Sequence, residues 1–242
     1  MTYQMPEIET KAVYVQQKFG EIAEKYDLFN DLITMGMHRW WKRFMVRQTG
    51  IGRNATCLDL CCGTGDIAQY LLNEAPDGQV YGMDFSSAML FHASQRYKTG
   101  MAHPQLLQGD AMKLPFADNR FDAVTVGFGL RNVSNLSGAL KEILRVLTPG
   151  GVLVSLDVGK VNVPLIKQIF HWFFFNIVPR IGKWLMPGQE MFDYLPHSAL
   201  EYPGQEQLKR LMLGLGFKQV DVHNFMFGSS TIHVAYKSSS EQ

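Results

Sequence analysis

The stretch TCLDLCCGTGD, residues 56–66, decides the fold class. Its first five residues are apolar enough for a buried strand, and two closely spaced glycines, Gly63 and Gly65, follow before the acid Asp66. The next residues, DIAQYLLNEA, have helical spacing. A strand, a glycine-containing turn and a helix in this order begin a strand–helix–strand unit, and the glycines let the backbone pass close to a ligand.

The same alternation continues along the chain. Further strands are predicted over 79–85, 105–109, 120–129 and 152–158, and helices over 86–98 and 136–147. We expect Pro149-Gly150-Gly151 to end the second of these helices. Strands that alternate with helices at this spacing predict a parallel sheet with helices on both faces.

The C-terminal part adds a helix, 204–216, and two strands, 217–223 and 230–237. The loop between these strands is too short for a parallel crossover, so the last strand should run antiparallel. We therefore expect an α/β fold, a doubly wound and mostly parallel seven-stranded sheet with an antiparallel last strand. A single domain, 1–242, would hold an N-terminal helical cap (12–50), a cofactor-binding core (51–160), a helical insertion after strand five (161–203), a C-terminal helix and strands (204–237) and a tail (238–242).

Composition excludes several classes of protein. The hydrophobic fraction of 46% supports a large core, and a formal net charge of +1 gives no general attraction for nucleic acid. The first ten residues have no apolar run, so we expect no secretory or transit peptide and a cytoplasmic protein. Cys57, Cys61 and Cys62 crowd one segment without zinc-site spacing. No metal site is expected, and these cysteines are interpreted as small residues of a tight turn.

Candidate binding residues follow from the fold, because ligands of such sheets bind at the carboxyl ends of the strands. Three of the first four predicted strands end in or beside an acid. The residues at these ends are Asp59, Gly63, Thr64 and Gly65 after strand one, Asp84 after strand two, Asp110 and Ala111 after strand three, and Gly127 after strand four.

The glycine loop by itself does not decide the ligand. Residues 63–68 satisfy the dinucleotide pattern G-x-G-x-x-A, which places a pyrophosphate at the following helix. Asp66 stands at that position and would repel the pyrophosphate, although its role could also be only that of a helix cap. Asp84 is placed to accept both hydroxyls of a ribose, and Asp110 to accept from an adenine amino group. An adenosine with a positive charge and no phosphate, S-adenosylmethionine, fits this set.

Four blocks, residues 18–43, 114–133, 145–157 and 194–203, resemble those of the UbiE/MenG quinone C-methyltransferases, which are class I methyltransferases. With the glycine loop, the resemblance covers residues 12–237. It implies methyl transfer from S-adenosylmethionine to a ring carbon of a polyprenylated quinol, which would be demethylmenaquinol, a phylloquinone precursor or a ubiquinone precursor. It also implies cofactor contacts at Thr64, Asp84, Asp110 and Ala111.

Two positions depart from the pattern of these methyltransferases. Gly127 replaces a serine that some members have, so only its backbone could contact the cofactor. Cys61 stands where the general methyltransferase pattern has its first glycine. The path of the loop at Cys61 is therefore an open point.

The chemistry requires that a quinol hydroxyl lose its proton, because the oxyanion makes the neighbouring ring carbon nucleophilic. A base within hydrogen-bond reach and a nearby cation both favour this ionisation. Arg131 is the candidate cation, with a loop-orienting salt bridge as the alternative role. Asp27, His38 and His197 are candidate catalytic groups, and each histidine could instead be structural.

Substrate contacts are expected at Tyr26, Asn132 and Tyr194, which lie in the family-like blocks. Tyr26 shares a helical face with Phe19, Ile22 and Ala23, so a position in the core is its alternative.

Residues 163–186 are strongly apolar, but Lys167, Pro179 and Arg180 interrupt the run, so it should not cross a bilayer. The spacing of its phenylalanines suits an interfacial helix or the wall of a tunnel for an isoprenoid tail. A helix packed on the sheet or on another subunit is equally compatible. Peripheral contact with the inner face of a membrane and a homodimer therefore both stay open.

Two functions from other classes use the same features. A nicotinamide-dependent oxidoreductase would bind NAD at the G-x-G-x-x-A loop. A catalytically silent module of a quinone-making complex would bind the cofactor without transferring a methyl group. A nucleic-acid methyltransferase is disfavoured, because Gly-Phe-Gly-Leu (127–130) stands where an N/D-P-P-Y/F motif would be.

Overall fold

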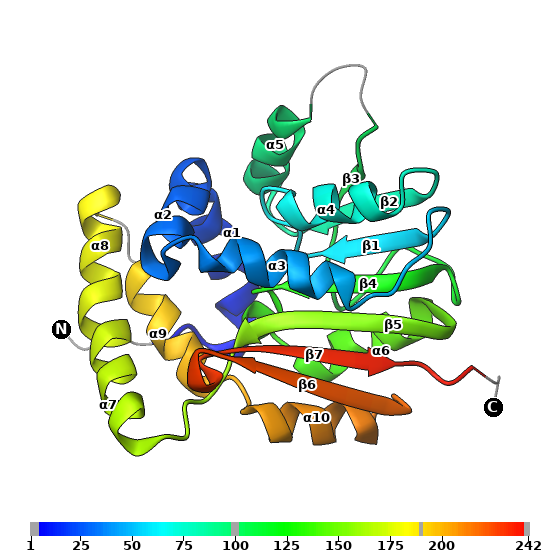
Figure 1. The fold of residues 1–242 in the computed structure, drawn as a ribbon. Coiled ribbons are helices and arrows are strands. Elements are labelled where there is room, and N and C mark those ends of the chain that lie inside the picture. The colour runs from blue at the N-terminus through cyan, green and yellow to red at the C-terminus, as the bar shows by residue number, and fades with distance from the viewer. Residues whose placement is uncertain (1–4, 98–101, 189–190, 240–242) are drawn as a thin grey trace.

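The structure, a computed structural model, describes residues 5–97, 102–188 and 191–239 (Figure 1). Its centre is a seven-stranded sheet with the strand order β3-β2-β1-β4-β5-β7-β6. All neighbours pair in parallel except β7, which is antiparallel to both β5 and β6, as the short final loop predicted. The strands are β1 (Thr56–Leu60), β2 (Gln79–Asp84), β3 (Gln105–Gln108), β4 (Phe121–Gly127), β5 (Leu147–Val158), β6 (Gln219–Phe225) and β7 (Ser230–Tyr236).

Helices cover both faces of this sheet, which confirms the doubly wound fold. They include α4 (Asp66–Glu74), α5 (Ser87–Arg96), α6 (Leu136–Val146) and α10 (Gln205–Gly214). Successive strand residues point to opposite faces. Leu58 therefore packs with Ile143 of α6 and Leu208 of α10 in one core cluster, while Cys57 packs with Leu71 of α4 in another.

The start of β5 differs from the sequence prediction. Helix α6 ends at Val146, and β5 begins at Leu147, which pairs with Phe121 of β4. The expectation that Pro149-Gly150-Gly151 ends the helix is wrong, because these residues form an irregularity inside the strand. Proline has no N–H for the ladder, and Gly150 adopts a φ of 79°, so the register shifts before regular pairing resumes at Val152.

A third, helical layer lies beyond the end of the sheet to which β1 points (Figure 1). Its helices are α1 (Ile8–Ile22), the 3-10 turn η1 (Ala23–Lys25), α2 (Tyr26–Thr34), α7 (Pro164–Trp172), the π-turn η3 (Phe173–Ile177), α8 (Val178–Leu185) and α9 (Met191–Glu201). Helix α3 (Met37–Arg47) runs from this layer onto one face of the sheet, where Met45 belongs to the same core cluster as Leu71 of α4. Phe29 of α2, Val178 of α8 and Phe192 of α9 belong to a core cluster of this layer. The N-terminal helices and the insertion after β5 thus form one unit, although they are far apart in sequence.

Within the described part of the chain, no helix has the length and apolar character needed to cross a membrane.

Candidate active site

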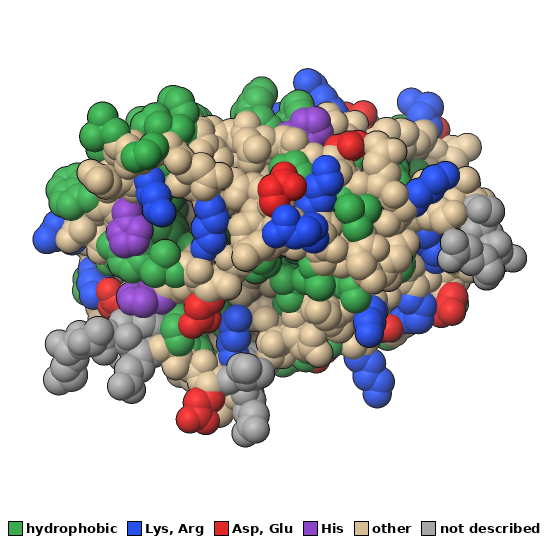
Figure 2. All heavy atoms as spheres, turned by 90° about the horizontal axis from the view of Figure 1, so that it is seen from below, with side chains coloured by type: hydrophobic (Ala, Val, Ile, Leu, Met, Phe, Trp, Pro, Cys, Tyr) green, Lys and Arg blue, Asp and Glu red, His purple; other side chains and the backbone are tan. Residues whose placement is uncertain are grey.

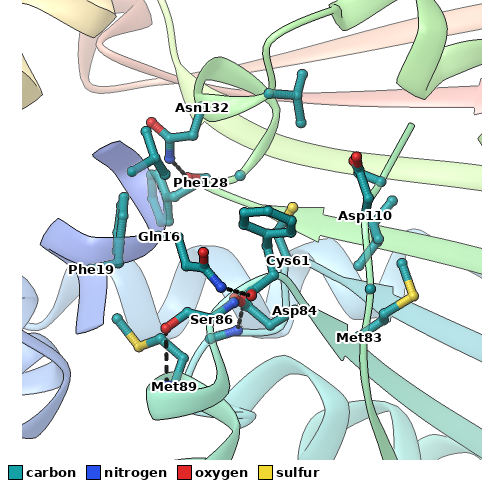
Figure 3. Close-up of a pocket in the computed structure, with 18 of the residues that line it drawn as sticks. Gln16, Phe19, Cys61, Met83, Asp84, Ser86, Met89, Asp110, Phe128 and Asn132 are labelled. Carbon is teal, nitrogen blue, oxygen red and sulfur yellow. Dashed lines mark hydrogen bonds between the residues drawn. The ribbon is translucent and has the colours of Figure 1, made fainter. Parts of the chain in front are cut away.

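A cavity lies at the carboxyl ends of the strands, as the fold requires. We call it the sheet-edge cavity (Figure 3). The structure brings five of the predicted cofactor residues to its wall, namely Gly63, Asp84, Asp110, Ala111 and Gly127. Predicted substrate residues Tyr26 and Asn132 also line it.

The glycine loop after β1 has a left-handed backbone. Gly63 has a φ of 54°, and Cys61 has a φ of 56°. Glycine adopts this left-handed conformation more readily than other residues. Cys61, which stands where the general methyltransferase pattern has a glycine, nevertheless adopts it. A Cβ on Gly63 would meet no atom within 4 Å, so open space lies in front of this backbone. Burial raises the pKa of the Cys61 thiol well above its ordinary value, which keeps it protonated.

Asp84, at the end of β2, holds the loop and keeps acceptor capacity for a ligand. One carboxylate oxygen accepts from the Gly63 N–H at 2.8 Å, and the other accepts from the Ser86 N–H at 2.8 Å. A carboxylate offers about four lone-pair sites, so roughly two are left, which matches the two hydroxyls of a ribose. Burial raises the pKa of this carboxyl, and the backbone donors around it oppose that shift.

Asp110, which follows β3, has a similar arrangement. Its Oδ1 accepts from the Met112 N–H at 2.9 Å. Among the described residues, its Oδ2 has no hydrogen-bond partner, and the side chain lines the cavity next to Ala111. It can therefore accept from an amino group without losing its existing contact.

Sequence reasoning missed the residues of α1 that cover the cavity. Gln16 donates from Nε2 to the Phe85 carbonyl oxygen at 2.9 Å, which joins α1 to the turn after β2. Figure 3 shows Phe19 and Gln16 of α1 at the cavity, with the Gln16 side chain reaching the turn beside Asp84. Phe85 and Ser86 could have been predicted as cavity residues, because they directly follow Asp84 in the sequence. No feature of the sequence indicated that Gln16 lines the cavity.

Asp59, Thr64 and Gly65 do not line the cavity. Their hydrogen bonds hold the glycine loop in place. Asp59 is fully buried and accepts from Thr125 Oγ1 at 2.8 Å and from the Ala68 N–H at 3.0 Å. Burial raises its pKa to about 8. Gly65, with a φ of 82°, is the N-cap of α4 and accepts at its carbonyl oxygen from Tyr97 Oη at 2.7 Å.

Thr64 links the loop to the N-terminal helices through Asp27. Thr64 Oγ1 donates to Asp27 Oδ1 at 2.9 Å, and Arg96 of α5 pairs with the other oxygen of Asp27. Arg96 also donates to the Thr64 carbonyl oxygen at 2.8 Å. Asp27, predicted as catalytic, lines neither this cavity nor the one described next, and in this structure it fastens α2 to the glycine loop.

A buried ion pair makes a second link between the cap and the loop. Lys42 Nζ of α3 lies 2.6 Å from Asp66 Oδ2, and both side chains are almost fully buried. Burial disfavours the charged form of each side chain. The attraction between the two opposite charges outweighs this effect, so the pKa of Asp66 is lowered and that of Lys42 is raised. Asp66 is thus an anion at the first turn of α4, where a pyrophosphate of a dinucleotide would need to bind.

A second cavity of about 370 Å³ adjoins the first and lies in the helical layer. We call it the helical cavity. Tyr26 and Phe128 line both cavities and so stand at their junction. The rest of its wall is mainly apolar and comes from α2, α3 and the α7–α8 segment; examples are Phe29, Ile33, Trp41, Ile166, Phe170, Phe173 and Phe174.

Arg131, in the 3-10 turn η2 (Leu130–Asn132) after β4, lines the helical cavity. Its Nη1 donates to Asp157 Oδ1 at 2.7 Å and to the Phe128 carbonyl oxygen at 2.8 Å. Burial opposes the charge of Arg131, but Asp157 raises its pKa, so it stays a cation. The loop-orienting salt bridge is therefore present. Its buried Nε, however, has no hydrogen-bond partner among the described residues.

His38 of α3 also lines the helical cavity, and its partner Asp31 was not predicted as functional. His38 Nε2 lies 2.9 Å from Asp31 Oδ1. Arg39 donates to both oxygens of Asp31 and, with His38, holds the pKa of that carboxyl well below its ordinary value. Because an ionised carboxylate only accepts, Nε2 must carry the proton, and Nδ1 of the neutral ring is an acceptor.

The remaining predicted residues lie beside the junction or farther away. Tyr194 is fully buried and donates from Oη to Asn132 Oδ1 at 3.1 Å. Asn132 donates in turn to the Phe128 carbonyl oxygen at 3.2 Å. His197 of α9 contacts the Asp193 carbonyl oxygen and lines neither cavity, with its ring 5.4 Å from that of Phe175.

The lining of the sheet-edge cavity fits S-adenosylmethionine. Asp84 and Asp110 are the only charged side chains in the described lining, so a cation is favoured and the phosphates of a nucleotide would lack a cationic partner. Open space at Gly63 admits a ligand close to the backbone. Met83, Met89 and Met112 supply apolar surface for a purine ring.

The fold and this cavity define a class I S-adenosylmethionine-dependent methyltransferase. Comparison with known proteins agrees and is more specific. The model of the ubiE/COQ5 methyltransferase family matches residues 7–237, and the chain belongs to that family. Because the chain belongs to a methyltransferase family, the G-x-G-x-x-A loop is not interpreted as the NAD site of an oxidoreductase.

Similar sequences include two bacterial proteins named demethylmenaquinone methyltransferase. The one from Leptospira interrogans is 47% identical over 245 residues, which cover 98% of each chain. The one from Staphylococcus aureus is 39% identical over 224 residues, or 92% of each chain.

Solved structures are similar in fold at low identity. The [4+2]-cyclase SpnF has a TM-score of 0.69 at 18% identity, with 93% of this chain and 96% of that one covered. A SAM-dependent methyltransferase from Aquifex aeolicus has a TM-score of 0.59 at 20% identity, with 81% and 88% covered.

Proposed function

We propose that this protein methylates a ring carbon of a polyprenylated quinol, converting demethylmenaquinol into menaquinol. The observation that carries the proposal is the junction of two unlike cavities, an acid-lined one that fits S-adenosylmethionine and a larger apolar one, at Tyr26 and Phe128. A hydrophobic quinol would bind in the second cavity with its ring at this junction. The names of the relatives from Leptospira and Staphylococcus support this substrate.

Asp84 and Asp110 would hold the nucleoside by its ribose hydroxyls and adenine amino group. Gly63 and Gly127 would contact it through backbone alone, and Gln16 and Phe19 of α1 would cover it and exclude water. Bound in this way, S-adenosylmethionine supplies an electrophilic sulfonium methyl group. The other requirements of the reaction fall on residues at the junction.

Arg131 would make the quinol hydroxyl more acidic. The overall exchange replaces a ring hydrogen by a methyl group and releases one proton, so ionisation of the quinol limits its nucleophilicity. Arg131 is the only Lys or Arg in the described lining of the helical cavity. Its buried Nε–H has no partner in the described structure and can donate to the developing oxyanion, directly or through a water.

His38 would accept the proton. Burial and the nearby charge of Lys42 lower its pKa below the ordinary 6.5, so the ring is neutral at neutral pH. Asp31 fixes the tautomer by holding Nε2–H, which makes Nδ1 the basic atom. The Nδ1 atom is buried and has no hydrogen-bond partner among the described residues. A quinol hydroxyl or a bridging water would give it one.

The α7–α8 segment would hold the isoprenoid tail. Phe170, Phe173 and Phe174 line the helical cavity next to Ile166 and Ile169, so a long apolar chain can follow this wall. Because such a substrate is dissolved in a bilayer, we propose a cytoplasmic enzyme that works at the membrane surface.

The test measures transfer of a labelled methyl group from S-adenosylmethionine to reduced demethylmenaquinone in detergent. A benzoquinol precursor of ubiquinone serves as the control substrate. The proposal expects label in the naphthoquinol product and little in the benzoquinol. Cofactor binding without transfer to any quinol would overturn it and would support the silent module instead, whereas transfer to the benzoquinol alone would assign the enzyme to ubiquinone synthesis.

A further inference from the structure

Exposed apolar side chains surround the mouth of the helical cavity. Met35, Ile169, Met226 and Phe227 line that cavity, yet they are 82%, 59%, 48% and 64% exposed. They come from three separate parts of the chain, namely the α2–α3 turn, α7, and the 3-10 turn η4 (Met226–Gly228) between β6 and β7. Exposed apolar residues that converge on one opening from unrelated segments mark an interaction surface.

Three of the residues at this mouth have an unusual backbone conformation. Met35, Met226 and Phe227 have φ values of 49°, 47° and 57°. Bulky L-residues rarely adopt this left-handed conformation, and glycine or asparagine would fit it with less strain. Strained backbone of this kind is concentrated at functional sites. Each of the three positions carries an exposed apolar side chain, which favours contact with an apolar partner.

Helix α7 extends the apolar surface outward from the mouth. Leu165, Ile169 and Trp172 are spaced i, i+4, i+7 and therefore lie along one face of the helix, with exposures of 68%, 59% and 58%. Figure 2 shows hydrophobic side chains gathered at the left end of the molecule, the end that carries α7 in Figure 1, with basic side chains beside them. Tryptophan and leucine beside basic residues are typical of helices that lie in a membrane interface.

The charge of this segment indicates the partner. Residues 158–189 contain four Lys or Arg and no Asp or Glu. Lys167 of α7 and Arg180 of α8 are exposed, and no acidic side chain of the described residues forms an ion pair with either. In a symmetric contact with a second copy, the same cationic segment would lie on both sides of the interface. Anionic phospholipid offers complementary charge and an apolar interior together.

We propose that this docking face, formed by Met35, Leu165, Ile169, Trp172, Met226 and Phe227 with Lys167 and Arg180 beside it, binds the surface of an anionic phospholipid bilayer. Docking brings the cavity mouth against the acyl region, so the quinol enters the helical cavity without crossing water. This inference rests on the proposed function for its purpose, but binding to lipid can be measured without any methyl transfer.

The experiment is co-sedimentation of the full-length protein with phosphatidylcholine vesicles, with and without phosphatidylglycerol. Binding is expected only to the vesicles with phosphatidylglycerol, and it should weaken as salt is raised. Lys167→Gln with Arg180→Gln removes two cations and should weaken binding about 25-fold at low salt, at roughly fivefold for each cation. Leu165→Ser and Trp172→Ser should each weaken it about tenfold.

Matched controls separate docking from folding and from catalysis. Phe91, on α5, is 60% exposed and lies outside both cavities, so Phe91→Ser should leave vesicle binding unchanged. Leu165 and Trp172 do not line either cavity, so their variants should keep cofactor affinity and activity on a short-tailed quinol in detergent. Equal binding of wild type and these variants would overturn the proposal. So would a stable dimer that Leu165→Ser dissociates, because a second copy would then cover the face. If vesicles bind as expected but no quinol is methylated, the proposed function fails and the docking face stands.

Discussion

Removal of the Asp84 carboxylate should nearly abolish binding of S-adenosylmethionine. In Asp84→Ala the two lone-pair sites left for the ribose hydroxyls disappear. A hydrogen bond to a charged group contributes about 1.5 to 3 kcal/mol, so the two together give about 3 to 6 kcal/mol. This corresponds to a loss of affinity of roughly 10²- to 10⁴-fold. Asp84→Asn keeps one acceptor oxygen and should fall between this variant and the wild type.

Isothermal titration calorimetry with S-adenosylmethionine and with S-adenosylhomocysteine measures this loss. Because Asp84 also accepts from the Gly63 and Ser86 N–H groups, the alanine variant should lose about 2 to 4 kcal/mol of stability, and titrations belong well below its melting temperature. Asp77→Ala is the matched control, since its ion pair with Arg53 is exposed and outside both cavities. An Asp84→Ala protein that is folded and binds the cofactor within threefold of the wild type would refute the ribose assignment.

Three further predictions concern the junction and the cap. Arg131→Gln should leave cofactor affinity, measured by calorimetry, within about threefold of the wild type. It should lower kcat by roughly 10²- to 10³-fold in the methyl-transfer assay, because it removes the cation near the oxyanion. Normal turnover of this variant would contradict the proposed role of Arg131. His38→Gln should lower kcat by roughly 10²- to 10⁴-fold. Since the pKa of His38 in the folded protein lies below 6.5, the wild-type kcat/KM should stay level as the pH falls to 6.5 and decrease only at lower pH. A decrease that begins above pH 6.5 would exclude His38 as the base. Lys42→Met leaves Asp66 buried without its partner and should lower the free energy of unfolding by about 3 to 5 kcal/mol, seen as a melting temperature lower by roughly 10 °C. The double variant Lys42→Met with Asp66→Asn should recover most of this stability. If it does not, loss of the ion pair is not the cause.

The sheet and its acidic strand ends were predictable, because each depends on short stretches of sequence. Strand and helix periodicity gave seven strands, and Asp84 and Asp110 lie in the sheet-edge cavity because parallel strands end at one edge. The antiparallel β7 followed from the length of one loop. The error at β5 had a local cause too, since Pro149-Gly150-Gly151 reads as a helix stop, but its conformation depends on pairing with Phe121 of β4.

The helical cavity and its polar groups could not be predicted, because they depend on contacts between distant segments. Arg131 and Asp157 are 26 residues apart, and the wall combines α2, α3 and the α7–α8 segment. Asp31 and His38 lie seven residues apart, across the α2–α3 turn, so helical spacing gives no sign that they meet. Asp59 was predicted as a ligand contact from its position at a strand end, and its burial could not be foreseen because it depends on Thr125 and the Ala68 N–H, whose groups its oxygens accept from.

The N-terminal helices make the two cavities depend on each other. They cover the sheet-edge cavity with Gln16 and Phe19 and form one wall of the helical cavity with Phe29 and Ile33. Two of the contacts that hold these helices in place are made to the glycine loop and the first residue of α4, namely Asp27 to Thr64 and Lys42 to Asp66. On the proposed function, a change in this loop would therefore affect the wall of the helical cavity as well as the cofactor. Since Tyr26 of these helices lines both cavities, the proposed substrate site would be complete only when the N-terminal helices are packed against the glycine loop.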